Sequence, residues 1–126
     1  MKLETAVLSL SALAQKSRLS IFRHLVQLGP AGSTPGDLIV QSGMSASTLS
    51  FHLKALTQAG LIVADQVGRS ITYRADFVAM QGLVDYLTEN CCGGDAAQCA
   101  PIAAPVAASM QTASPRLKPR KTSRAK

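Results

Sequence analysis

Two short helix patterns separated by a tight turn constrain the fold of this chain more than any other feature. Thr34 offers a capping hydroxyl, Pro35 suits the first helical position, and Gly43 ends this first helix because glycine tolerates left-handed backbone angles. Ser45 then caps a second helix, which Gly60 ends. Two short helices joined by a glycine-containing turn of about three or four residues are typical of a helix-turn-helix.

The residues after this motif predict a β-hairpin. Leu61 and Val63 begin a pattern with a period of two, and Gly68-Arg69 separates residues 65–67 from residues 70–74. The flanking segments contain β-branched and aromatic side chains, which favour strands on both sides of a glycine turn. A hairpin directly after the second helix of a helix-turn-helix is a wing.

Amphipathic helices are predicted on both sides of this unit. One begins at Leu3, another spans about Ser17 to Leu28, and Asp76 caps the last. The fold class is therefore mainly α with a β-hairpin wing, a winged helix-turn-helix. So small a core cannot cover all the apolar surface of the first and last helices, and we expect a homodimer through these two helices. The apolar positions are Leu3, Ala6, Val7, Leu10 and Leu13 in the first helix, Leu19, Phe22, Leu25 and Val26 in the second, and Phe77, Met80, Leu83, Val84 and Leu87 in the last.

The chain divides into a body, residues 1–92, for DNA binding and dimerisation, and a tail, residues 93–126. The tail is rich in Ala, Pro, Gly, Ser and basic residues without periodicity, so we expect it to be disordered and flexible. Its last sixteen residues, 111–126, hold the whole excess of positive charge, because six of the 13 Lys and Arg residues and no acid lie after residue 110. The tail either adds salt-dependent attraction to nucleic acid or serves only as a solubilising end.

Composition argues against several classes of protein. There is no run of 18 apolar residues and no secretory pattern, so we expect no membrane association and a cytoplasmic location. Aromatic residues make up 4% of the chain with no Trp, which disfavours a binder of single strands or sugars. No base or cation neighbours the cysteines in sequence, so we expect no enzyme. A winged helix that binds only other proteins is a further functional class that the composition leaves open.

The second helix of the helix-turn-helix predicts a polar outer face. Leu49, Leu53 and Leu56 lie inward at about 100° per residue, and His52 at the edge of this stripe is expected to be a structural hydrogen-bonding residue. The outer face is either a solvated surface or, with the wing beside it, a reader of double-stranded operator DNA. Small hydroxyls fit the major groove, and basic residues pair with phosphates. The DNA-binding residues are predicted to be Ser45, Ser47, Thr48, Ser50, Phe51, Lys54 and Arg69.

Three segments carry a resemblance to a known family: residues 14–19, residues 45–56, and residues 59–62 together with Gly68-Arg69. They resemble the ArsR/SmtB family of metal-responsive repressors, and the match runs from about residue 3 to residue 90. The resemblance implies a dimer that blocks transcription until an inducer binds. Two recognition helices about 34 Å apart would fit an inverted repeat with half-sites one DNA turn apart.

The chain departs from the founding arsenic repressors of this family. They resemble one another in a Cys-x-Cys motif on the first helix of the helix-turn-helix, where this chain has Asp37-Leu38-Ile39-Val40. Sensing at that position is excluded. Cys91-Cys92 followed by Cys99 instead resembles an arsenic-responsive subgroup whose thiols lie after the last helix.

The cysteine cluster suits a soft metal ion. Trivalent arsenic, or antimony, binds three thiolates, and Gly93-Gly94 allows Cys99 to fold back toward Cys91 and Cys92. Zinc would need a fourth ligand, such as Asp95 or water. The sequence therefore predicts a repressor that releases its operator when As(III) or Sb(III) binds these three residues. Another thiophilic metal or thiol oxidation is the alternative, and the cysteines can also be incidental.

Overall fold

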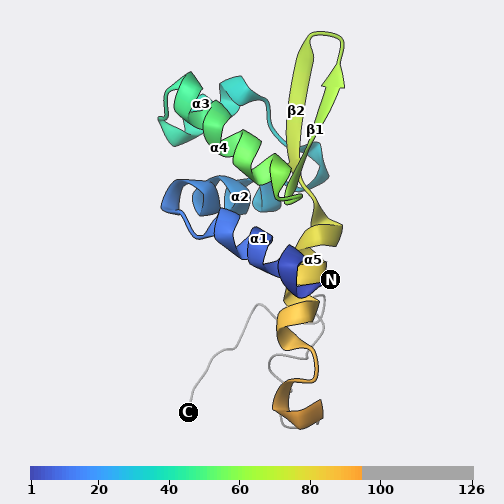
Figure 1. Cartoon of the computed structure of the whole chain (residues 1–126). Helices are drawn as coiled ribbons and strands as arrows, with labels where there is room; N and C mark the ends of the chain where they lie inside the picture. Colours follow the sequence, from blue (N-terminus) through green and yellow to red (C-terminus); the bar gives the residue numbers. More distant parts are fainter. Residues whose placement is uncertain (95–126) are drawn as a thin grey trace, which may run out of the picture. The chain divides into compact units, whose positions relative to one another are not determined.

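A computed structural model describes residues 1–94 of the chain (Figure 1). The residues form two units, Met1–Leu87 and a second that begins at Thr88. The order of elements confirms the predicted winged helix-turn-helix. The elements are α1 (Leu3–Leu13), α2 (Lys16–Leu28), the 3-10 turn η1 (Gly29–Ala31), α3 (Pro35–Ser42), α4 (Ala46–Gln58), β1 (Ile62–Val67), β2 (Ser70–Ala75), α5 (Phe77–Thr88) and the 3-10 turn η2 (Cys91–Gly94).

The boundaries of the helix-turn-helix follow the predicted capping residues. The Thr34 hydroxyl accepts a hydrogen bond from the Asp37 amide at 3.2 Å, which caps α3. Gly43 ends α3 in the left-handed region, with φ 75° and ψ 6°, and α4 begins three residues later. Asp76 likewise caps α5, because its Oδ1 accepts from the Ala79 amide at 3.0 Å.

The core of the first unit lies where α2, α3 and α4 meet the base of the hairpin. Leu49, Leu53 and Leu56 of α4 are almost completely buried there, as their spacing predicts. Phe77 and Met80 at the start of α5 pack against this core and are half-buried. The other buried residues of the core are Ala12, Ile21, Phe22, Leu25, Leu38, Leu61, Ile62 and Ala75.

The apolar stripe of α1 does not lie against the core as a whole. Ala6, Ser9 and Ala12 are buried, whereas Leu3 and Val7 are 62% and 51% exposed. Small side chains face inward because they allow α1 to lie close to α2 and α4. Most of the large side chains of α1 are therefore left on its outer side.

The inner face of α2 also differs by one position from the predicted stripe. Leu19 is 42% exposed, and Ile21 occupies a buried position beside Phe22 and Leu25. The helix begins at Lys16 because the Gln15 side chain caps it, with Oε1 accepting from the Arg18 amide at 2.9 Å. None of the helices in the described part of the chain is long and apolar enough to cross a membrane.

The hairpin is joined to the helix-turn-helix at its base. Its strands are antiparallel, from Ile62 opposite Ala75 to Val67 opposite Ser70. Ser33, just before α3, pairs with Tyr73 of β2 through two backbone hydrogen bonds of 2.8 Å. This short bridge connects the wing to the loop that leads into α3.

Gly32 is required where that loop meets β2. Its φ is +66°, and a Cβ at this position would overlap the carbonyl oxygen of Tyr73. We expect Gly32→Ala to lower the free energy of unfolding by about 3 kcal/mol, since a backbone clash adds to the left-handed strain. The measurement is urea unfolding followed by circular dichroism.

Gly43→Ala is the matched control for this substitution. Gly43 has φ +75° but nothing within 4 Å of an added Cβ, so only the strain of about 1 kcal/mol applies. Equal losses for the two variants would contradict the claim that the approach of Tyr73 matters.

Candidate nucleic-acid interface

The outer face of α4 carries the predicted DNA-binding residues at exposed positions. Its first turn gathers three hydroxyls, because the Ser45 hydroxyl donates to Thr48 Oγ1 at 2.9 Å and lies 3.4 Å from Ser47 Oγ. The same Ser45 oxygen accepts from the Thr48 amide at 3.2 Å. These hydroxyls stand at the positive end of the helix dipole, which favours negatively charged groups. The exposed residues are Ser45, Ser47, Thr48, Ser50, Phe51 and Lys54.

The hairpin contributes a cation at its turn. Arg69 is exposed between the two strands, which rise beside α3 and α4 in Figure 1. Arg74, in contrast, is paired with Asp65 at 2.7 Å, so much of its charge is compensated on the hairpin itself. Arg69 and Lys54 therefore offer positive charge on two different elements of the same unit, the arrangement that phosphate contacts need.

Arg18 supports α4 from behind, a role that the sequence reading did not assign. Its Nε donates to the Ala12 carbonyl at 2.7 Å, and its Nη1 donates to His52 Nδ1 at 3.5 Å. His52 is 7% exposed, which agrees with the structural role expected for it. Arg18 thus connects the end of α1 to the middle of α4. The only signal in the sequence was its place in the segment 14–19 that resembles a known family.

Known proteins are similar to this chain in the region of the helix-turn-helix. A family model described as a helix-turn-helix domain matches residues 13–63. The HTH-type transcriptional regulator NmtR of Mycobacterium tuberculosis is 45% identical over 65 residues, which is 52% of this chain and 52% of the relative. The chain thus spans about half the length of this curated relative.

Solved structures resemble the fold over a larger share of the chain. An ArsR-like transcriptional regulator from Rhodococcus sp. RHA1 has a TM-score of 0.63 and 26% identity, covering 78% of this chain and 90% of that one. Mb0332 from Mycobacterium bovis, described as a homodimeric winged helix-turn-helix DNA-binding domain and a possible ArsR-family transcriptional regulator, has a TM-score of 0.55 and 28% identity over 70% of this chain and 82% of its own. The chain is thus similar to ArsR-like transcriptional regulators in its helix-turn-helix sequence and in its winged helix-turn-helix fold.

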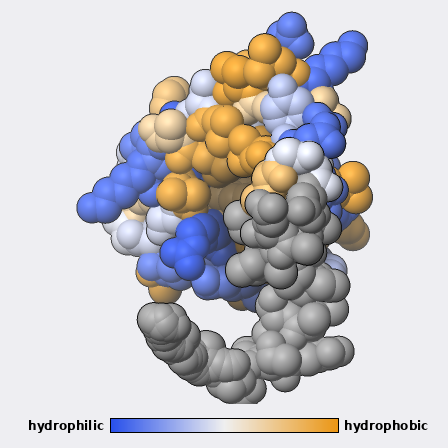
Figure 2. Space-filling model, turned by 90° about the horizontal axis from the view of Figure 1, so that it is seen from below, coloured by the Kyte–Doolittle hydropathy of each residue, from blue (hydrophilic) through white to orange (hydrophobic). Residues whose placement is uncertain are grey.

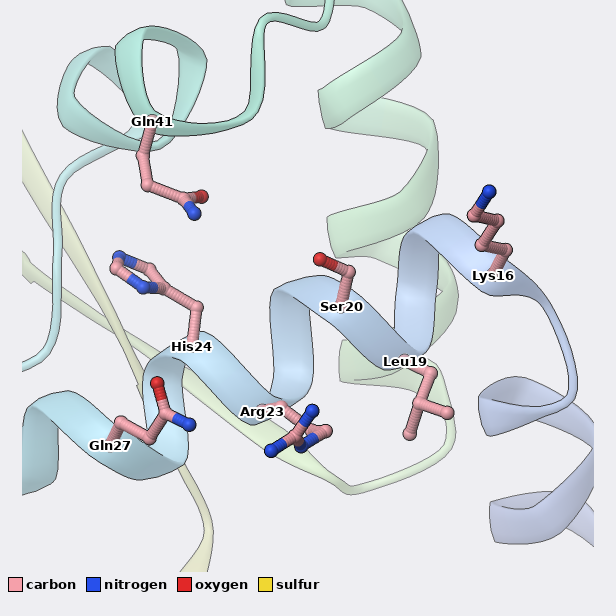
Figure 3. Close-up of a pocket in the computed structure, with 7 residues that line it drawn as sticks. All are labelled: Lys16, Leu19, Ser20, Arg23, His24, Gln27 and Gln41. Atoms are coloured by element: carbon pink, nitrogen blue, oxygen red, sulfur yellow. The ribbon is translucent and has the colours of Figure 1, made fainter.

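A hollow of about 320 Å³ between α2 and α3 lies outside the surface described above (Figure 3). Its side chains diverge, since His24 points toward Gln41 whereas Arg23 and Leu19 point away from it. The lining holds one imidazole and neither a carboxylate nor a thiol, so it provides no ligand set for a metal. The hollow is therefore no candidate for the metal site of this protein.

The cysteines lie in the second unit. Cys91 is a free, half-buried thiol, whereas Cys92 is disulfide-bonded. Cys92 and Asn90 have left-handed backbone angles, with φ 55° and 57°, where the chain turns after α5. Cys99 lies outside the described residues. Within residues 1–94 no group of three or more His, Cys, Asp or Glu side chains is placed to hold a metal ion, so the predicted three-thiol set stays a prediction.

Ser45 is expected to stabilise α4 through its cap. Replacing it by Ala removes the acceptor of the Thr48 amide and should cost about 1 kcal/mol of unfolding free energy, while Ser45→Asp should retain most of the stability. Thermal or urea unfolding measures both variants. Ser50→Ala, at an exposed position inside α4, is the control and should change stability by less than about 0.5 kcal/mol. A Ser45→Ala protein as stable as the wild type would contradict the capping role.

Proposed function

We propose that this protein is a transcriptional repressor of the ArsR/SmtB family that binds double-stranded operator DNA as a homodimer. The observation that carries the proposal is the exposed outer face of α4, with three hydroxyls at the helix N-terminus and Lys54, in a unit whose wing exposes Arg69 at its turn. Hydroxyls and a helix N-terminus contact bases and phosphates, and cations add phosphate pairing. The relatives named as transcriptional regulators support a binding role rather than an enzymatic one.

The dimer is proposed to form through α1 and α5. Both helices leave large apolar side chains in water, and Figure 2 shows apolar residues gathered on the face of the molecule seen from below. Exposed apolar surface of this extent is typical of an interaction site, and a symmetric dimer would cover it on both copies. The homodimeric description of Mb0332 supports a dimer. The exposed residues are Leu3, Val7, Leu8 and Leu10 of α1, and Val78, Val84 and Leu87 of α5.

The first prediction from this proposal concerns the form of the bound DNA. Duplexes enriched from a random library by the wild-type protein should contain an inverted repeat with half-sites about one helical turn apart. Lys54→Ala should weaken binding. It should also lower the slope of log Kd against log salt concentration by the amount expected for the loss of about one phosphate contact per protomer. Fluorescence anisotropy at several salt concentrations measures both effects.

Lys16→Ala is the matched control, because it removes the same charge from an exposed position on α2. It should leave the salt slope near that of the wild type. Enrichment of no duplex at all, or an equal change in slope for the two variants, would contradict the proposed DNA interface.

We further propose that trivalent arsenic, or antimony, is the inducer and that Cys91, Cys92 and Cys99 bind it. Three thiols within nine residues support this, since three thiolates complete the coordination of such an ion. Cys91 follows the end of α5 by three residues, so ligation there is connected through the chain to a helix of the proposed dimer interface. Release of DNA requires a coupling free energy of about 1–3 kcal/mol between the two sites.

Arsenite is expected to release DNA only from the reduced protein. Ligation needs thiolates, and Cys92 has to be reduced before it can bind an ion. With a reductant present, arsenite should lower the anisotropy of the wild-type complex, and Cys91→Ser, Cys92→Ser and Cys99→Ser should each prevent this. Gln98→Ser, a substitution in the same segment, is the control and should still release DNA. Serine variants that dissociate as readily as the wild type would overturn the arsenic site.

The disulfide of Cys92 favours a second candidate, release by thiol oxidation. Two thiols would then lose two electrons and two protons to an oxidant such as hydrogen peroxide, which becomes water while the S–S bond forms. Release by peroxide without arsenite, lost in Cys92→Ser, would support this candidate in place of the metal.

A further inference from the structure

Phe51 is an apolar side chain on a polar surface, and phosphate contacts do not explain it. It is 64% exposed in the middle of the outer face of α4. Ser47 and Lys54 are its neighbours on that face by helical spacing. The exposed phenyl ring at this position is available for contact with a binding partner.

The ring of Phe51 is held in place from below. Its centroid lies 5.5 Å from that of His52, with an angle of 64° between the ring planes, which is an edge-to-face contact. His52 is itself buried and lies 3.5 Å from the Arg18 guanidinium. The Phe51 ring therefore has a contact with a buried residue, which reduces the side-chain freedom that it would lose on binding.

The chemistry of the surrounding face points to DNA as the partner. Among the residues of α4, Phe51 is the exposed large apolar one, whereas a protein-binding patch needs several such residues together. The edges of base pairs in the major groove offer one strongly apolar group, the C5 methyl of thymine. From Ser45 to Lys54 there is no Arg, Asn or Gln, the residues that read guanine and adenine with paired hydrogen bonds.

We propose that Phe51 determines sequence specificity by contacting the C5 methyl of a thymine in each operator half-site. This inference rests on the proposed DNA-binding function and deepens it. The hydroxyls of the first turn and Lys54 position α4 in the groove, because each of these groups can bind phosphates or more than one type of base. Phe51 then distinguishes a half-site that has a methyl group at this position from one that has none.

The test removes the methyl group without changing any hydrogen-bonding atom. The probe is the duplex enriched by the wild-type protein, in which each thymine is replaced in turn by deoxyuridine in both half-sites. At one position the replacement should weaken wild-type binding by about fourfold per half-site, the effect of one buried methyl group, or about 15-fold for both. Phe51→Ala should bind the thymine and deoxyuridine duplexes equally at that position. Anisotropy measures the affinities, and circular dichroism shows that the variant is folded.

Lys54→Ala is the control, because it changes another residue of the same face of α4 that is not expected to contact the methyl group. It should bind both duplexes more weakly while keeping the wild-type ratio between them, because it contacts phosphate rather than the methyl group. If the wild type binds both duplexes equally at every position, or if Phe51→Ala keeps the preference for thymine, this inference is overturned while the DNA-binding function stands. If no duplex is enriched, both fall together.

Discussion

Burial of the leucine stripe of α4 decides which side chains of this helix are exposed to solvent. Leu49, Leu53 and Leu56 are at most 3% exposed, and each contributes about 1.5–3 kcal/mol by leaving water. Rotating the helix by a third of a turn would expose all three, at a cost comparable to the whole stability of a small domain. The orientation of α4 is therefore fixed by the core, and Ser47, Phe51 and Lys54 face outward as a consequence.

Arg18 gives the fold a physical connection between two surfaces with different tasks. Through the Ala12 carbonyl it contacts the end of α1, the helix proposed to lie in the dimer interface, and through His52 it contacts the helix proposed to lie on DNA. A change in the dimer that moved the end of α1 would reach α4 through these contacts. These contacts are one part of a coupling between the proposed dimer interface and the proposed DNA-binding surface. They transmit a change only if α1 and α4 have two alternative arrangements.

The sequence predicted the features that depend on neighbouring residues. Thr34, Gly43, Ser45 and Asp76 act within one helical turn, so their chemistry alone placed the ends of α3, α4 and α5. The leucine spacing also gave the correct inner face of α4. Those positions agree because capping and periodicity are local properties.

Features that depend on distant residues could not be predicted in this way. The bridge between Ser33 and Tyr73 joins positions forty residues apart along the chain, and no local pattern reports it. In α1 the largest apolar residues suggested the inner face, but close packing against α2 and α4 selected Ala6, Ser9 and Ala12 instead. The identities of the inducer and of the operator are even harder to predict from the sequence, because a cysteine cluster or a polar helix face suits several ligands.

The Ser33–Tyr73 bridge has a consequence for how such a protein can evolve. It anchors the base of the hairpin to the body, while the turn with Val67 and Arg69 stays in solvent and contributes little to the core. Substitutions or insertions at that turn would leave folding almost untouched. In the proposed repressor, affinity for different promoters would therefore drift at the tip of the wing without a penalty in the amount of folded protein in the cell.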